Sequence, residues 1–280
     1  MDPIETVRAL CPASGDRRPG SAANDEAVDL VAGLLEGFGW DVDLPEFPVL
    51  DWEGGKGTVV VEGETVPVVP SPYGVGVDGR GPIRVVGTRP ELDDPDLEGS
   101  VLVVRGDLVE GPLTPKKYPF YGSEEHTAII DALETRPPTA IVAVTGKHPA
   151  LCGALDPYPW VEDGDFTIPA ASVSPAAAGP LLAHVGQDAE VSIGARRIDS
   201  SARNVVARRG PQGRRVTVCA HIDAKPGTPG AVDNAAGVAV LVALAERLAD
   251  AELPIGVELL AVNGEDHFAA GGELDWLAAN

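Results

Sequence analysis

The chain has 280 residues, of which 44% are hydrophobic, so it is long enough to form one large or two ordinary domains. Its 43 acidic and 21 basic residues give a net charge of −22, and a surface of this sign repels nucleic acid and anionic membranes. The longest apolar runs fall short of the roughly 18 residues that a membrane-spanning helix needs, so no transmembrane segment is expected.

The charge is spread along the chain, and Lys supplies five of the bases. Such an acid-rich, Lys-poor composition is typical of proteins from salt-loving archaea; a moderately acidic mesophilic enzyme is the alternative. The three cysteines, at 11, 152 and 219, show no paired spacing, which argues against a disulfide framework or a Cys zinc site. The N-terminal MDPIETVRAL lacks the pattern of a signal peptide, so a cytoplasmic location is expected.

Residues 1–43 are expected to be largely helical. Ser21 or Asn24 can cap a helix that Gly39 ends, and Trp40 begins a strand. The apolar stripe of this helix comprises Val28, Val31, Leu34, Leu35 and Phe38.

From about residue 45 to 194 the chain becomes rich in short apolar runs separated by Gly and Pro, which predicts a β-rich domain. The expected strands are 58–61, 66–69, 83–87, 101–105, 140–145 and 189–193, and the expected helices are 124–134 and 175–185. His126, His148 and His184 are interpreted as surface or core residues rather than ligands. The segment Lys116-Lys117-Tyr118 either contacts a substrate carboxylate or is an ordinary loop.

The stretch from Val216 to Asp266 carries the residues best suited to catalysis. Residues 216–220 read as a buried strand, in which Cys219 is expected to be covered, and His221 and Asp223 follow it. A Gly/Pro-rich loop leads to Asp233-Asn234, which open a helical pattern, and Pro254 follows that helix. Residues 256–262 read as a second strand, with Glu265-Asp266 just past its end. Sites form at the carboxyl ends of strands in α/β sheets, so these side chains are expected to lie together.

Imidazole nitrogen and carboxylate oxygen are zinc ligands, so the pattern favours a metal site. An acid that is not a ligand, beside one that is, can take a proton from water, which suits Glu265 next to Asp266. Asp223 can accept the second N–H of His221 and fix its tautomer. Taken singly, each element has an ordinary explanation: a surface His-x-Asp pair, a helix cap at Asp233, and a solvated loop at Glu265-Asp266.

These motifs together resemble the co-catalytic dizinc exopeptidases of clan MH, in particular their aminopeptidase branch. The resemblance is carried by His221-Ile222-Asp223, by Gly230-Ala-Val-Asp-Asn-Ala-Ala-Gly237, by Glu265-Asp266 and by Gly271-Gly272, and it covers residues 203–273. A shorter likeness is Arg17-Arg18-Pro19-Gly20-Ser21, similar to the family's Arg-x-Pro-Gly-Ser segment. The run from Phe166 to Ser174 resembles part of the protease-associated domain inserted in many of these peptidases.

The resemblance implies that His221 is a ligand of one zinc, Asp233 bridges two zinc ions, Asp266 is a ligand of the second ion, and Glu265 is the general base. It also implies a cis peptide bond between Asp233 and Asn234. Asp266 stands where the family has Glu. The family takes an Asp and a His from further downstream, so the sequence reads as the front part of such an enzyme.

We therefore expect an α/β fold, a zinc-exopeptidase-like αβα sandwich with a mixed sheet, formed by residues 1–44 and 196–280. Residues 45–195 are expected to form an inserted, β-rich, protease-associated-like domain. The expected function is zinc-dependent aminopeptidase hydrolysis of peptides, impaired in this chain, with two zinc ions as cofactor; an oligomer remains open. The alternatives are a non-enzymatic protein on this fold, as in transferrin-receptor-like relatives, and a carboxypeptidase or aminoacyl cyclotransferase.

Overall fold

The structure is a computed structural model of the chain, and it describes residues 2–11, 16–147 and 155–280. The chain divides into two compact units: unit 1 is Met1–Asp51 with Asp199–Asn280, and unit 2 is Trp52–Ile198. Unit 2 therefore begins after the expected residue 45 and ends after the expected residue 195. Both boundaries fall within long strands, β2 (Glu46–Val61) and β8 (Asp188–Arg203), which each run from one unit into the other.

Unit 1 contains a four-stranded mixed sheet in the order β1-β9-β11-β10. Strands β10 and β11 are parallel, whereas β9 is antiparallel to both of its neighbours, β1 and β11. The elements of unit 1 are α1 (Pro3–Leu10), α2 (Ala22–Gly37), β1 (Asp41–Asp43), β9 (Val205–Arg209), β10 (Arg215–His221), a π-type turn η5 (Ala231–Ala235), α5 (Ala236–Leu248), β11 (Gly256–Val262) and α6 (Gly271–Ala279).

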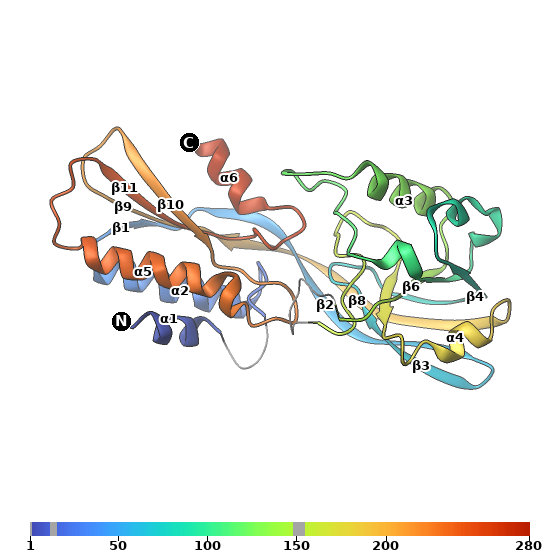
Figure 1. Cartoon of the computed structure of the whole chain (residues 1–280). Coiled ribbons are helices and arrows are strands. Elements are labelled where there is room, and N and C mark those ends of the chain that lie inside the picture. The colour runs from blue at the N-terminus through green and yellow to red at the C-terminus, as the bar shows by residue number, and fades with distance from the viewer. Residues whose placement is uncertain (1, 12–15, 148–154) are drawn as a thin grey trace. The chain divides into compact units, whose positions relative to one another are not determined.

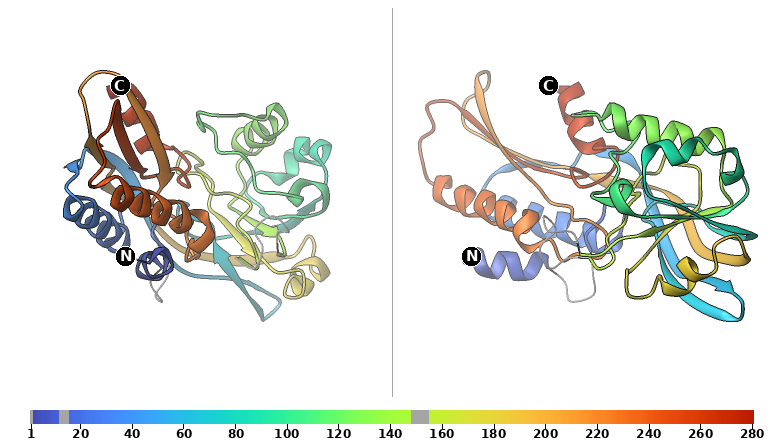
Figure 2. Two further views of the ribbon diagram at one scale, coloured as in Figure 1. Left: turned by 60° about the vertical axis from the view of Figure 1, so that its left-hand side comes forward. Right: turned by 45° about the vertical axis from the view of Figure 1, so that its right-hand side comes forward.

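The two faces of this sheet are covered unequally. Helices α1, α2 and α5 lie on one face, and α6 lies on the other (Figures 1 and 2). Because side chains alternate along a strand, Leu259 packs with the three helices whereas Leu260 packs toward Trp276 of α6. This arrangement is the αβα sandwich with a mixed sheet that the sequence predicts.

Local sequence explains how these elements begin and end. The Ser21 hydroxyl accepts a hydrogen bond from the Asn24 amide at 3.2 Å, so Ser21, not Asn24, is the N-cap of α2. Gly39, at φ +76°, follows the helix end as expected. Strand β11 has the predicted bounds. The third helix begins at Ala236 rather than at Asp233, because Asp233 and Asn234 have non-helical backbone angles.

Cys219 is exposed, and the prediction that it is buried is therefore wrong. Its strand β10 is at the edge of the sheet, where β11 is its partner among the described strands. Cys219 points to the face that α6 covers only in part. Its apolar neighbours in sequence could not reveal this, because burial depends on which strand lies beside β10.

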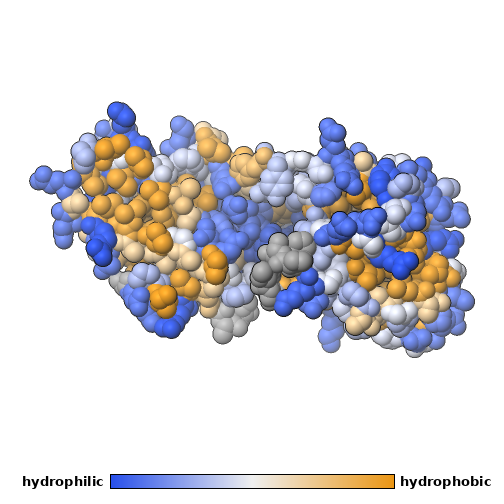
Figure 3. All heavy atoms as spheres, viewed as in Figure 1, coloured by the Kyte–Doolittle hydropathy of each residue, from blue (hydrophilic) through white to orange (hydrophobic). Residues whose placement is uncertain are grey.

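Unit 1 also exposes several large apolar side chains. The exposed fractions are 52% for Val216 of β10, 62% for Val240 of α5, and 43% and 56% for Leu274 and Leu277 of α6. Figure 3 shows hydrophobic colour gathered over the part of the molecule where α5 and the sheet lie in Figure 1. An uncovered strand edge and apolar patches of this kind are typical of surfaces that contact further polypeptide.

One carboxylate is fully buried in the sheet. Glu258 of β11 receives hydrogen bonds from Arg208 at 2.7 Å, from Arg215 at 2.8 Å and from Thr217 at 3.2 Å. Burial by itself raises the pKa of Glu258, but the two guanidinium groups outweigh burial and lower it. The side chain therefore stays charged and joins three strands of the sheet.

Replacing Glu258 by Gln is expected to lower the free energy of unfolding by about 2–3 kcal/mol at neutral pH, since two arginines lose a buried partner. The folded-state pKa is depressed, so the stabilisation is complete above the unfolded-state pKa of about 4.3 and is lost as pH falls through the folded-state value. Urea unfolding of both proteins at several pH values should show stabilities that begin to converge as the pH falls below the unfolded-state pKa of about 4.3. The matched control is Glu53→Gln, which removes an exposed ion pair with Arg196 and should cost about 0.5 kcal/mol or less. Curves that stay parallel in acid would contradict this role.

Unit 2 is built on a closed barrel of strands in the order β2-β3-β7-β6-β5-β4-β8. Its centre is an aliphatic cluster that includes Val59, Ile83 and Val142, and a second cluster packs α3 against the outside of β5 and β6. The elements are β3 (Glu64–Pro70), β4 (Val77–Val86), η1 (Arg89–Asp93), η2 (Pro95–Leu97), β5 (Val101–Val104), η3 (Gly106–Val109), α3 (Glu124–Thr135), β6 (Ala140–Val144), β7 (Ala170–Val173) and α4 (Gly179–Ala183). The expected β-rich character is observed. Among the described helices of the whole chain, none is long and apolar enough to cross a membrane.

Candidate metal centre

The candidate site lies where two parallel strands of unit 1 end side by side. His221 is the last residue of β10, and its register partner is Val262, the last residue of β11. Because the strands are parallel, the loops that follow them leave the sheet at the same edge. One loop carries His221 and Asp223, and the other carries Glu265 and Asp266.

The predicted side chains converge at this edge. The Nε2 atom of His221 lies 3.0 Å from Oδ1 of Asp233 and 3.5 Å from Oε2 of Glu265. His221, Glu265 and Asp266 each present a possible ligand atom, and these atoms lie within 4.8 Å of one another. The structure thus brings together the residues that the sequence predicted for the site. The chemical role of each residue remains a prediction.

Asp233 reaches the site through an unusual turn. Gly230, at φ +54°, occupies the left-handed region, and a β-carbon there would lie 2.4 Å from the Ala224 side chain. The Asp233–Asn234 peptide bond is cis, as the resemblance implies. The Asn234 side chain then accepts a hydrogen bond from the Gly237 amide at 2.9 Å in the first turn of α5. The Asp233 carboxylate is left 78% exposed and faces the imidazole.

Asp223 is buried and holds the opposite loop. Its two carboxylate oxygens accept hydrogen bonds from the amides of Glu265, at 3.2 Å, and Asp266, at 2.9 Å. The His221 Nδ1 lies 3.2 Å from the Asp223 carbonyl oxygen and 3.5 Å from its Oδ1. The carbonyl is therefore the nearer acceptor for Nδ1–H, and this contact leaves Nε2 directed at the acids.

The clustered acids shift the pKa values of the site. Burial lowers the pKa of His221, but the carboxylates of Asp223, Asp266 and Glu265 outweigh burial and raise it to about 9. Burial raises the pKa of Asp266 to about 7, with Asp223 adding to the rise and Lys225 opposing it. A site with this excess of negative charge around one imidazole is electrostatically suited to a cation.

The donor set fits zinc. Imidazole nitrogen and carboxylate oxygen bind Zn²⁺ at about 2.0–2.2 Å, so two ligands of one ion lie at most about 4.4 Å apart. The His221 Nε2 and the Asp233 Oδ1, at 3.0 Å, are within this limit, and Asp266 belongs with His221 to a group whose possible ligand atoms all lie within 4.8 Å of one another. His221, Asp233 and Asp266 would hold the metal, and Glu265 lies within 3.5 Å of the same imidazole.

The other predicted residues lie in unit 2 and are engaged elsewhere. His126 forms hydrogen bonds with Thr114, and His184 lies 3.3 Å from Glu64, whereas His148 lies outside the described residues. The ammonium groups of Lys116 and Lys117 bind Glu134 and Asp165 at 2.7 and 2.9 Å. These contacts favour the ordinary-loop interpretation of the lysine segment.

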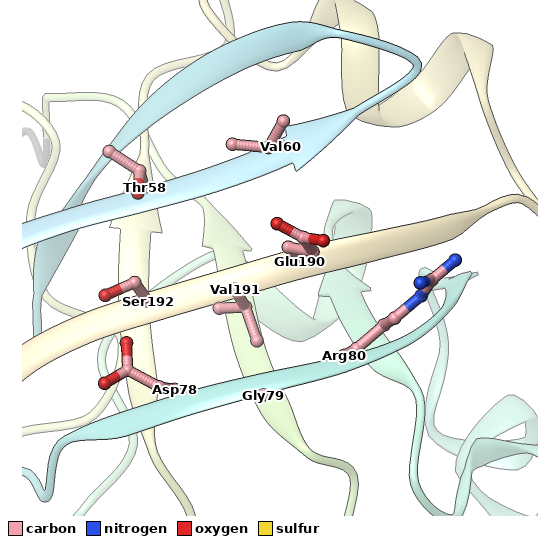
Figure 4. A pocket seen from close by; sticks show the side chains of 8 residues that line it. All are labelled: Thr58, Val60, Asp78, Gly79, Arg80, Glu190, Val191 and Ser192. Atoms are coloured by element: carbon pink, nitrogen blue, oxygen red, sulfur yellow. The ribbon is translucent and has the colours of Figure 1, made fainter.

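Unit 2 has a separate surface hollow against β2, β4 and β8 (Figure 4). It is lined by Thr58, Val60, Asp78, Gly79, Arg80, Glu190, Val191 and Ser192. These eight residues include neither His nor Cys, and Arg80 is already paired with Asp188 at 3.2 Å. The hollow offers two carboxylates, Asp78 and Glu190, but no imidazole or thiolate, whereas the group of three possible metal ligands among the described residues lies in unit 1.

Sequence reasoning missed two basic residues near the centre. Lys225 places its Nζ 3.8 Å from Oδ1 of Asp266. Arg17 is fully buried and contacts the backbone on both sides of the loop that precedes Asp233. The signal for Arg17 was the Arg17–Ser21 segment, but nothing in that segment indicates which distant loop it binds.

Comparison with known proteins defines the class first. The fold is that of zinc aminopeptidases. The aminopeptidase from Aneurinibacillus sp. strain AM-1 superposes with a TM-score of 0.72 at 19% identity, over 99% of this chain and 65% of that one. The zinc aminopeptidase BSAP from Bacillus subtilis gives 0.71 at 19% identity, over 94% and 60%.

The sequence comparisons then give the family. Residues 204–275, which contain the whole candidate site, match the model of peptidase family M28, and the resemblance to zinc exopeptidases is confirmed. The "Probable lipoprotein aminopeptidase LpqL" of Mycobacterium tuberculosis is 28% identical over 276 residues, which cover 94% of this chain and 51% of that protein. The chain thus spans about half the length of this curated relative.

Proposed function

We propose that this chain carries the metal-binding part of an aminopeptidase that removes N-terminal residues from peptides. The observation that supports the proposal most is the convergence of His221 with Asp233, Glu265 and Asp266 at one sheet edge. The family match over residues 204–275 and the aminopeptidase names of the similar proteins point in the same direction.

We assign the residues the following roles. His221, Asp233 and Asp266 would hold the zinc, with Asp233 shared if two ions bind, and Asp223 positions both strand-end loops. When bound there, zinc would supply Lewis acidity and lower the pKa of water. Glu265, whose carboxylate lies 3.5 Å from the His221 Nε2, would take the proton from the attacking water and return it to the leaving amine.

Unit 2 is proposed to be a protease-associated-like domain that acts as a lid or spacer. Two observations support this proposal: unit 2 is a β-rich barrel, and its described histidines and the Lys116-Lys117 pair are held in local contacts. A halophilic setting remains a proposal that rests on composition, and a cytoplasmic location remains a proposal.

Zinc titration of the protein in high salt tests the assignment of ligands. Asp266→Asn is expected to weaken zinc binding by about 100-fold, because a ligand loses its charge, while Glu265→Gln should change it by no more than about threefold. Isothermal calorimetry, or the visible spectrum of the Co²⁺ form, measures both. Equal losses in the two variants would contradict the separate roles of base and ligand.

Substrate assays decide between the related reactions. Hydrolysis of aminoacyl-p-nitroanilides that requires a free amine supports aminopeptidase chemistry. Preference for N-blocked peptides would indicate a carboxypeptidase, and cyclisation of N-terminal glutaminyl peptides would indicate a cyclotransferase. Zinc binding without any of these reactions would favour a non-enzymatic role.

A further inference from the structure

Arg17 lies fully buried in unit 1, and the charge of its guanidinium is met by backbone carbonyls. Its Nε donates to the Ile222 carbonyl at 3.0 Å, and its Nη2 donates to Gly230 at 3.1 Å. Its Nη1 donates to Leu10, at 2.7 Å, and to Pro229, at 2.5 Å. Four carbonyls from three separate stretches of chain therefore converge on one cation.

Three of these carbonyls belong to the loop that precedes Asp233. Ile222 stands between His221 and Asp223, and Gly230 lies three residues before Asp233. The planar guanidinium offers its donors in a fixed fork, so it sets the separation of the two ends of this loop. The Nε2 of His221 and the Oδ1 of Asp233, which come from those two ends, lie 3.0 Å apart.

The backbone next to this side chain reaches the second acidic loop. The Arg17 carbonyl accepts a hydrogen bond from the Asn24 side chain at 2.9 Å. Asn24 and Asn263 exchange two side-chain hydrogen bonds, at 3.0 and 2.7 Å, and both are fully buried. Asn263 directly precedes Gly264-Glu265-Asp266. The segment from Arg17 to Asn24 thus contacts both the loop that precedes Asp233 and the start of the loop that carries Glu265 and Asp266.

We propose that Arg17 is a positioning residue, which fixes the approach of His221 to Asp233 by closing the loop between them. This proposal rests on the proposed function only for the metal-binding and catalytic roles of the acids. The positioning of the loop by Arg17 does not depend on it. It gives the Arg17–Ser21 segment a role at the site, although the segment is about 200 residues away in sequence. Arg18 differs, because it binds the carboxylates of Asp16 and Asp51 rather than the loop.

Hydrogen exchange of the metal-free protein tests this role without any assay of activity. In Arg17→Met, amides of residues 222–235 are expected to exchange at least about tenfold faster relative to those of β11, because the loop loses its closing contacts. The matched control is Val28→Ala, which opens a cavity in the same core of unit 1. Its exchange should rise across the unit without singling out the loop.

A second variant keeps the test decisive if Arg17→Met folds poorly. Arg17→Gly leaves a space that methylguanidinium can enter, and adding this cation should restore protection of residues 222–235 and recover zinc affinity about tenfold, whereas tetramethylammonium should not. Exchange that rises equally in the loop and in β11, or no rescue by methylguanidinium, would overturn the proposal. If wild-type protein binds no zinc while the loop effect is present, the proposed function fails and the positioning role of Arg17 stands.

Discussion

Replacing His221 by Ala is expected to weaken zinc binding by more than about 100-fold. This loss exceeds the 10–100-fold that is typical when a residue hydrogen-bonded to a metal ligand is removed, because His221 is itself a proposed ligand. His221 is the single nitrogen donor in the converging group, and its Nε2 is directed at Asp233 and Glu265. Without it, four acids would remain close together beside Lys225, and a zinc ion would be held by carboxylates alone.

Calorimetric titration with Zn²⁺ measures the loss, and the matched control is His184→Ala, a partly exposed His of unit 2 that lies beside Glu64. The control should bind zinc as the wild-type protein does. A wild-type-like affinity in His221→Ala would mean that zinc binds elsewhere, and the candidate centre would then be wrong. Retained Co²⁺ absorption with an altered band position would instead show that the carboxylates hold the ion without the imidazole.

Much of the site could be predicted because its residues follow apolar runs directly. His221 ends β10, and Glu265-Asp266 come just past β11, so short-range patterns placed each at a strand end. The meeting of the two ends follows from parallel pairing, which a strand-helix-strand order favours. The cis bond at Asp233 came from the resemblance alone, because no local propensity favours it.

The contacts that were missed connect residues far apart in the chain. Arg17 and Ile222 are separated by 205 positions, and Asn24 and Asn263 by 239. Hydropathy assigns Arg and Asn to the surface. The side chains of Arg17, Asn24 and Asn263 are nevertheless fully buried, because each finds hydrogen-bond partners in the folded chain. Asp223 was expected to serve His221, but it also accepts the amides of Glu265 and Asp266, a role that requires knowing which loops are neighbours.

Sheet position explains the remaining errors. Cys219 lies in an apolar run, but β10 is an edge strand in the described sheet, so that run is half exposed. Helix α6 was not predicted, because its short sequence begins with two glycines, residues that disfavour helix. Its apolar residues Leu274 and Leu277 remain largely exposed, so packing on the sheet does not account for the whole of its hydrophobic surface.

The 280-residue chain by itself is expected to hydrolyse aminoacyl-p-nitroanilides at least about 1,000-fold more slowly than a zinc aminopeptidase such as that of Bacillus subtilis. Catalytic zinc normally has three protein ligands and an open position for water. In the assignment proposed here, the described residues supply His221 and Asp233 to one ion and Asp233 and Asp266 to the other, which is two ligands for each. Weak metal binding and an altered charge balance would leave water at the site less acidic. Glu265 would then abstract its proton more slowly.

The measurement is the turnover of purified protein with added Zn²⁺ or Co²⁺ in high salt, with Glu265→Gln as the control for contaminating peptidases. Turnover that is comparable with that of the Bacillus subtilis enzyme, and that Glu265→Gln abolishes, would refute the expectation and show that the residues present suffice.

Size-exclusion chromatography of the same sample shows whether any activity belongs to the monomer or to an oligomer. Strand β10, which pairs on one side among the described strands, and the exposed Val216, Leu274 and Leu277 offer a surface for another chain. Activity that elutes only with a higher oligomer would show that a partner copy contributes to the site, because a monomer with the same residues would then be inactive.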